Sequence, residues 1–124
     1  HVSEFIVSKR IKNVVEFDKT NKKLRFLLDE GDQVYYYKDL ENIGISCEYH
    51  HNLKKALAHN LLFPTYAEGR QFVRVGIRMK VRMGQSVFVH VSEDIVDKGT
   101  MQYHEDMRTA RQIVDLLRKC RAKA

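Results

Sequence analysis

The residues best suited to chemistry are five cations between positions 70 and 82. In the run from Phe72 to Met83, apolar side chains take every second position and most of the positions between them are basic. Alternate residues of a strand share a face and stand about 6.6–7 Å apart, close to the phosphate repeat of a nucleic-acid strand. Such a face could equally meet acidic lipid head groups or an acidic peptide, or simply be a solvated face that discourages aggregation. The cations are Arg70, Arg74, Arg78, Lys80 and Arg82.

The histidines lack the spacing of a metal site. A structural zinc site needs about four Cys, His or acidic ligands, with close pairs such as C-x2-C or H-x3-H. Neither pair occurs in the sequence, although His51 and His59 could share one face of a helix. We therefore expect no metal ion. The histidines considered are His50, His51, His59, His90 and His104.

Catalytic motifs are missing too. The sequence contains no G-x-S-x-G, no Walker-type loop and no G-x-G-x-x-G. Cys47 falls in a predicted strand and Cys120 near the end of a predicted helix, where free buried thiols are commoner than reactive ones; a disulfide between them stays open. Four acids lie beside turns, with nothing that marks two of them as an acid/base pair. They are Glu41, Glu48, Asp94 and Asp97. We expect neither enzymatic activity nor a cofactor.

Short strands must position most of these residues. Apolar residues alternate in brief runs that are separated by polar clusters, which is the pattern of antiparallel strands and turns. The predicted strands cover about 14–17, 23–28, 33–37 and 43–47, with turns at 18–21 and 29–32 and a break at Lys38-Asp39.

The strand signal is clearest over residues 72–83, the segment that carries the cations. Gly84-Gln85 is predicted to turn this strand into a partner strand with Val87, Val89 and Val91 on its apolar face. A slip of one residue would bury the cations, so the pairing is strongly specified. The apolar face of the first strand is Val73, Val75, Ile77, Met79, Val81 and Met83.

Two segments have helical spacing instead. Apolar residues from Leu53 to Leu61 predict a short helix at about 52–61, which must end before Pro64. From about Met101 an apolar stripe predicts an amphipathic helix that docks on the sheet. Glu105 and Asp106 are expected in its first turn, where carboxylates complement the helix dipole. The stripe is Tyr103, Met107, Ala110, Ile113, Val114, Leu117 and Cys120.

The bulk composition fits one globular domain over residues 1–124. Apolar residues make up 44% and charged residues 31% of the chain, and no apolar run approaches the length of a membrane span. The net charge of +6 and the pI near 9.4 favour anionic partners. Because the chain starts at His1 rather than Met, we expect a fragment of a longer protein.

Two blocks of the sequence resemble a bacterial pleckstrin-homology-like (PH-like) domain. The first runs from Lys12 to Leu24 and continues at Tyr35–Ile43; the second is Lys98–Tyr103 with the helix behind it. The resemblance implies an α+β fold, a PH-like antiparallel barrel or sandwich of about seven short strands capped by a C-terminal amphipathic helix. The predicted helix at about 52–61 stands where many relatives carry a glycine-rich apolar insertion.

The resemblance also implies a function class. PH-like modules serve as non-catalytic interaction or scaffold parts of larger bacterial proteins, cytoplasmic or attached to the membrane periphery through the parent protein. A protein or peptide partner is expected first, because an exposed sheet edge suits β-augmentation, and an anionic lipid surface second. The alternative is a small basic nucleic-acid-binding domain that uses the strand at 70–82. A homo-oligomer stays open.

The run Tyr35-Tyr36-Tyr37 cannot form a single stacking platform. On a strand, Tyr35 and Tyr37 point to one side and Val34 and Tyr36 to the other. The resemblance aligns Tyr37 with core positions, while the residues alone leave open which side faces water.

Overall fold

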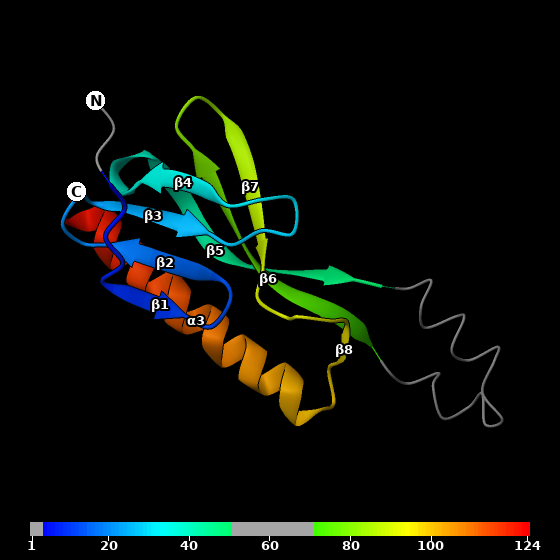
Figure 1. Ribbon diagram of the computed structural model, residues 1–124. Helices are drawn as coiled ribbons and strands as arrows, with labels where there is room; N and C mark the ends of the chain where they lie inside the picture. The colour runs from blue at the N-terminus through cyan, green and yellow to red at the C-terminus, as the bar shows by residue number, and fades with distance from the viewer. Residues whose placement is uncertain (1–3, 51–70) are drawn as a thin grey trace, which may run out of the picture.

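The computed structural model describes residues 4–50 and 71–124, so the helix expected at about 52–61 lies outside the described residues. Within them the fold is α+β, with two antiparallel sheets followed by one long C-terminal helix (Figure 1). The elements are β1 (Lys9–Ile11), β2 (Val15–Asp18), β3 (Lys23–Phe26), β4 (Gln33–Tyr36), the 3-10 turn η1 (Tyr37–Asp39), β5 (Leu40–Tyr49), β6 (Phe72–Val81), β7 (Gln85–His90), β8 (Val96–Asp97) and α3 (Met101–Ala122).

The first sheet is a meander with the order β1-β2-β3-β4. The polar turn clusters separate its strands as the sequence predicts, so that Val15 pairs with Phe26 and Leu24 with Tyr35. Side chains alternate between the two faces, which places Val15, Leu24 and Phe26 in the core.

The second sheet has the order β5-β6-β7, and β8 pairs with the first two residues of β6. β6 is the central strand, because it pairs with β5 along most of its length and with β7 from Gly76 onward. A register shift between Glu41 and Gly44, where Asn42 has φ +51°, bends the start of β5.

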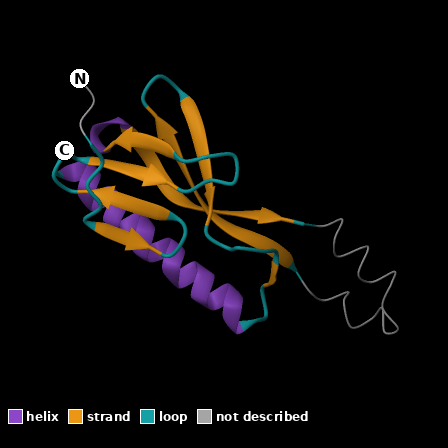
Figure 2. Ribbon diagram, in the orientation of Figure 1, coloured by secondary structure: helices purple, strands orange, loops and turns teal. Residues whose placement is uncertain are grey.

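The C-terminal helix α3 packs against β5, β6 and η1 (Figure 2). Residues of its predicted apolar stripe belong to the shared hydrophobic core. Thr100 caps its start, and the Thr100 Oγ1 accepts a hydrogen bond from the Tyr103 backbone N–H at 3.3 Å. Near its end, the guanidinium groups of Arg118 and Arg121 donate to the backbone carbonyls of Ile43 and Leu40 at 2.8 and 2.9 Å. Both arginines thus tie the helix to β5.

The core lies between the two sheets and α3. It contains the alternating inward residues of the strands and four residues of the helix stripe. Tyr103, Met107 and Cys120, the remaining members of that stripe, are half-buried at its margin.

Three expectations need correction. The two sheets of the described residues do not close into the expected barrel; the described residues contain eight strands, of which β1 and β8 are too short to leave an alternating signal. β6 ends at Val81, so Met83 lies in the following turn and is 98% exposed rather than part of the apolar face. Glu105 and Asp106 both lie beyond the first turn of α3, and Asp106 is buried.

The tyrosine run divides as strand geometry requires. Tyr37 is buried in the core, and Tyr35 is half-buried with its ring 6.1 Å from that of Phe26. Val34 and Tyr36 face outward, each 48% exposed, so a single ring of the run is freely presented. The expected core position of Tyr37 is confirmed by its burial.

Candidate functional site

The cations of β6 lie on its outer face, as the alternation predicts. Val73, Val75 and Ile77 point inward and are fully buried. The structure brings Arg74, Arg78, Lys80 and, just past the strand end, Arg82 onto the opposite side, while Arg70 lies outside the described residues.

Arg74 differs from the other cations because its guanidinium is used inside the molecule. Its Nε donates to the Ser92 carbonyl at 3.0 Å and its Nη2 to the Glu93 carbonyl at 3.2 Å. The Asp29 carboxylate lies 3.9 Å away. Arg74 therefore holds the loop after β7 in place and has little left to offer a partner.

Arg78 is exposed and lies over an aromatic ring. Its guanidinium carbon is 5.7 Å from the centre of the Phe88 ring on the neighbouring strand β7. Phe88 in turn lies across Gly76, where a Cβ would come within 2.5 Å of Phe88 Cζ. The cation–π contact leaves the charge of Arg78 available to solvent.

Lys80 and Arg82 end the row at the hairpin, near two acids. Lys80 pairs in register with Glu41 of β5, and both side chains are exposed. Arg82 is 68% exposed with its Nη1 3.9 Å from Asp39 Oδ1. The Arg82 backbone N–H donates to the Asp39 carbonyl at 2.8 Å, which fixes the base of the hairpin against η1.

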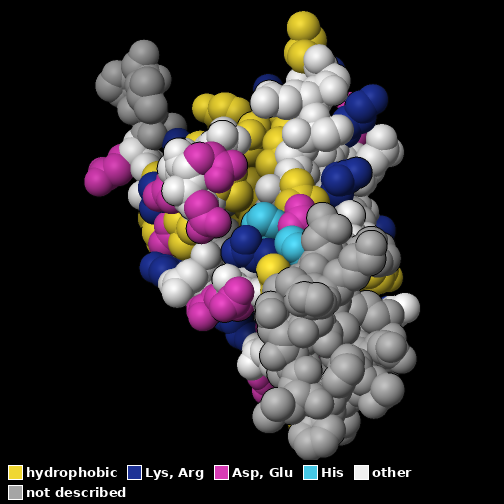
Figure 3. Space-filling view, turned by 90° about the vertical axis from the view of Figure 1, so that its right-hand side faces the viewer, with side chains coloured by type: hydrophobic (Ala, Val, Ile, Leu, Met, Phe, Trp, Pro, Cys, Tyr) yellow, Lys and Arg dark blue, Asp and Glu magenta, His cyan; other side chains and the backbone are white. Residues whose placement is uncertain are grey.

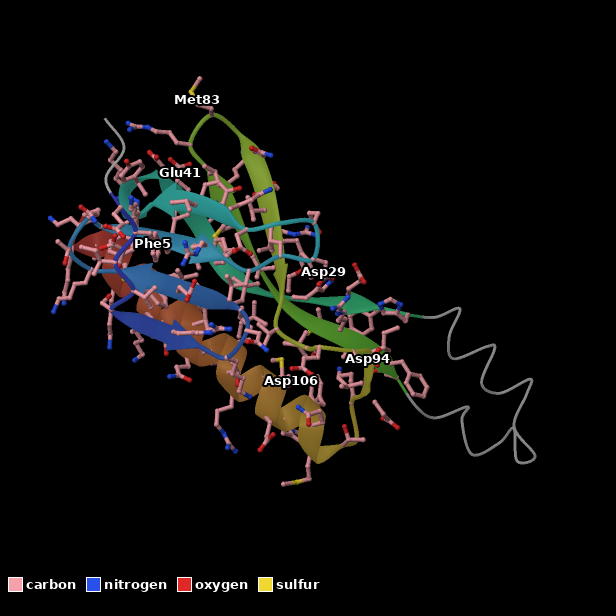
Figure 4. The ribbon with its side chains drawn as sticks, in the orientation of Figure 1. Phe5, Asp29, Glu41, Met83, Asp94 and Asp106 are labelled. Atoms are coloured by element: carbon pink, nitrogen blue, oxygen red, sulfur yellow. The ribbon has the colours of Figure 1, made fainter. Side chains whose placement is uncertain are left out.

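Met83 forms the tip of the β6–β7 hairpin. The turn closes with a hydrogen bond from the Gly84 N–H to the Val81 carbonyl at 3.0 Å. Met83 has φ +84°, a conformation that glycine or asparagine adopts more readily. Its side chain points away from the body of the molecule (Figure 4). The sequence pattern did not identify Met83 as a turn residue, because the alternation of apolar and basic residues continues beyond the end of β6 at Val81.

A second group gathers at the other end of the same face. Glu48 Oε1 lies 2.9 Å from His50 Nε2 and 4.0 Å from His90 Nε2. Burial and the neighbouring Arg74 lower the pKa of His90 despite the nearby acids. His90 Nε2 is itself buried without a hydrogen-bond partner. Burial therefore disfavours the charged form of this imidazole.

Neither metal binding nor nucleophilic chemistry gains support from the described residues. No group of three or more His, Cys, Asp or Glu side chains there could hold a metal ion; His51 and His59 lie outside them, and His104 is exposed beside Tyr103. Cys47 and Cys120 are free thiols, and burial raises the pKa of each. A raised thiol pKa disfavours the reactive thiolate.

The predicted acids have structural or solvent contacts. Asp94 Oδ1 accepts from the Ile95 backbone N–H at 2.9 Å, and Asp97 Oδ1 accepts from the Gly99 N–H at 2.9 Å. Asp97 thus shapes the turn into α3. No two of the four predicted acids are brought together as an acid/base pair in the described part of the chain.

The structure adds a cleft of about 920 Å³ that sequence patterns did not reveal. It lies between the β1–β2 and β3–β4 turns on one side and β7, its following loop and the start of α3 on the other. Figure 3 shows this face, with histidine and basic side chains set between groups of acids. The cleft brings together residues far apart in sequence, so only the tertiary structure makes it visible.

Comparisons with known proteins give no relative: no family model, no curated protein and no solved structure matches the chain. None of the helices within residues 4–50 and 71–124 is both long and apolar enough to cross a membrane. The function must therefore be argued from the geometry.

Proposed function

We propose that the chain is a non-catalytic interaction module with a PH-like arrangement, and that it docks the β6–β7 hairpin on an anionic membrane surface. The order of elements supports the arrangement: a four-strand meander, a second sheet built on β5-β6-β7, and a single C-terminal helix. The partner is argued from the hairpin.

The observation that carries the proposal is the exposed Met83 at the end of a row of cations. Met83 is 98% exposed in a conformation unfavourable for its residue type, so the fold gains nothing from its side chain. Next to Met83, the outer face of the hairpin carries three cations, Arg78, Lys80 and Arg82. An apolar tip beside cations matches an anionic bilayer, where the methionine enters the head-group region and the cations meet phosphates.

The expected affinity is modest. Each cation near an anionic membrane contributes about 1 kcal/mol, and burying a methionine contributes about 1.5–3 kcal/mol. Together these give about 5 kcal/mol, which corresponds to dissociation constants of roughly 0.1–1 mM in lipid. Stable attachment then requires a second membrane signal from elsewhere in a parent protein or assembly.

Two other partners receive less support from the described residues. Arg118 and Arg121 already occupy the carbonyls of Ile43 and Leu40, so an added peptide strand would not find free backbone acceptors at the start of β5. A nucleic-acid strand would be matched by a longer row of cations and free rings, but Arg74 is engaged internally and Phe88 lies against Arg78 and Gly76.

Vesicle co-sedimentation tests the proposal. The protein should bind phosphatidylglycerol vesicles at millimolar lipid, should not bind phosphatidylcholine vesicles, and should dissociate as salt is raised. The triple variant Arg78→Gln, Lys80→Gln, Arg82→Gln should lose about 100-fold in affinity, because it removes roughly 3 kcal/mol of electrostatic attraction.

A matched control separates local attraction from net charge. The triple variant Lys9→Gln, Lys19→Gln, Lys22→Gln removes three exposed cations from β1 and the β2–β3 turn, and both triple variants lower the formal charge from +6 to +3. The control should bind nearly as well as the wild type. Equal loss in both variants, or binding to a DNA or RNA strand at about 50 mM salt with none to vesicles, would overturn the proposal.

A further inference from the structure

The cleft at the far end of β6 and β7 from Met83 has features of a binding site of its own. Its volume of about 920 Å³ falls within the range of small-ligand sites. Three separate segments and the start of α3 enclose it, as Figure 4 shows for Asp29, Asp94 and Asp106. Its apolar lining consists of Val14, Leu27, Leu28, Phe88, Val91 and Val96.

The charge of the cleft is negative, and its own cations are few. Lys12 and Arg74 are the basic residues of the lining, and Arg74 is engaged by two backbone carbonyls. Burial and Arg74 lower the pKa of His90, which disfavours a positive charge on its imidazole. The acids of the lining are Asp29, Glu30, Glu93, Asp94 and Asp106.

The exposed acids of the lining form the rim of the cleft: Asp29, Glu30, Glu93 and Asp94. Asp106 is a buried acid of the same lining and provides a separate observation. It is 4% exposed, and no lysine, arginine or histidine nitrogen of the described residues lies within 4.0 Å of its carboxylate. Within residues 4–50 and 71–124, its oxygens accept only from neutral donors, Ser92 Oγ at 2.7 Å and Gln102 Nε2 at 2.9 Å. A carboxylate can accept about four hydrogen bonds, so acceptor capacity remains for a ligand.

The described residues supply no cationic partner for this carboxylate. Ser92 Oγ also accepts from the Val75 backbone N–H at 3.0 Å, which fixes the Ser92–Asp106 pair to the central strand β6. A buried carboxylate without a cation is unfavourable, and a bound cation would relieve that cost. His90 Nε2, buried and without a hydrogen-bond partner, lies on the same lining.

We propose that this cleft binds an ammonium or guanidinium group carried on an apolar chain. The cation would sit between Asp106 and the rim acids, and the chain would lie along the apolar lining. A free aliphatic amine and the side chain of a lysine or arginine in a peptide share this chemistry. The site is separate from the hairpin, so its failure would leave the membrane proposal standing, and the reverse also holds.

Titration followed by two-dimensional NMR tests the inference with three probes: n-hexylammonium, a blocked lysine- and arginine-containing tetrapeptide, and hexanoate. We expect saturable shifts at cleft residues with either cation and none with hexanoate, at dissociation constants below about 10 mM. Binding of the amine identifies a small-molecule cation site, and binding of the peptide alone identifies a peptide site. Either supports the assigned chemistry.

Variants make the test specific. The rim variant Glu93→Gln, Asp94→Asn changes exposed residues and should weaken cation binding at least fivefold; Asp106→Asn should abolish it. The control Glu41→Gln, Asp115→Asn removes the same charge from exposed positions outside the cleft and should bind like the wild type. Absence of saturable binding by both cations, equal binding of hexanoate, or unchanged binding by the rim variant would overturn the inference.

Discussion

At the scale of single residues, Gly76 occupies a position on β6 where a side chain does not fit. A Cβ there would lie 2.5 Å from Phe88 Cζ and 2.8 Å from the Val89 carbonyl oxygen. The ring could shift, but the backbone oxygen belongs to the paired strand β7. Gly76 therefore allows Phe88 to lie flat across the sheet beneath Arg78.

We predict that Gly76→Ala destabilises the protein by about 1–3 kcal/mol, the cost typical of overpacking. Gly44→Ala is the matched control, because nothing lies within 4 Å of a Cβ there and its φ is not positive. That control should be neutral or slightly stabilising. Urea denaturation of both variants measures the difference, and equal stabilities would show that the Phe88 packing is wrong.

Asp18 is a buried acid whose hydrogen bonds lower its pKa. It is fully buried; its carboxylate accepts from the Ile6 backbone N–H at 3.0 Å and from the Asn21 backbone N–H and side chain at 2.9 and 2.7 Å. Burial raises the pKa of Asp18, but these hydrogen bonds and the charge of Lys23 together lower it by more. The net pKa of Asp18 therefore lies below the ordinary 3.8.

The sign of the pH dependence follows from that lowered pKa. The stabilisation from Asp18 is fully present above pH 3.8 and is lost as the pH falls through the lower folded pKa. Asp18→Asn should cost about 1–3 kcal/mol near pH 7, and the gap to the wild type should narrow toward pH 2. Urea titrations at several pH values measure it; a gap that widens with acid would contradict the assignment.

At the scale of elements, α3 is tied to β5 by apolar packing and by two arginines. Leu117 is fully buried among strand residues, while Arg118 and Arg121 reach back to the β5 carbonyls. The amphipathic pattern predicted the first contact. It could not predict the arginine contacts, because Arg118 lies on the exposed side of the helix. Only its long side chain reaches the backbone of β5.

Leu117→Ala should lower the free energy of unfolding by about 2–5 kcal/mol, as expected for a leucine removed from a packed core. Asp115→Ala, on the exposed side of the same helix, should change it by less than about 0.5 kcal/mol. Thermal or urea denaturation provides the comparison. Similar small effects in both variants would mean that α3 is not docked as described.

Sequence periodicity predicted the elements better than their ends. The alternation in β6 specifies its register because a slip would bury its cations, and the structure confirms it. The same alternation wrongly placed Met83 in the apolar face, because the pattern continues through Arg82 and Met83 although β6 ends at Val81. The burial of Asp106 depends on Ser92, fourteen positions earlier, so local pattern gave no signal for it.

At the scale of the whole molecule, the second sheet carries two chemically different regions at opposite ends of β6 and β7. The hairpin end presents Met83 and cations, whereas the other end adjoins the acidic cleft. This separation would orient the domain at an anionic membrane, with the hairpin toward the surface and the cleft away from it. The start of α3 lies far from the hairpin tip (Figure 1).

The four methionines make the central claim directly measurable. With methyl-¹³C-methionine labelling, phosphatidylglycerol vesicles carrying a spin-labelled head group should attenuate the Met83 methyl signal most strongly, relative to vesicles without the label. Met101 is 81% exposed at the start of α3 and should be spared, and Met79, in the core, should show little change. Attenuation of Met101 equal to or greater than that of Met83, or no selective attenuation of Met83, would contradict docking through the hairpin.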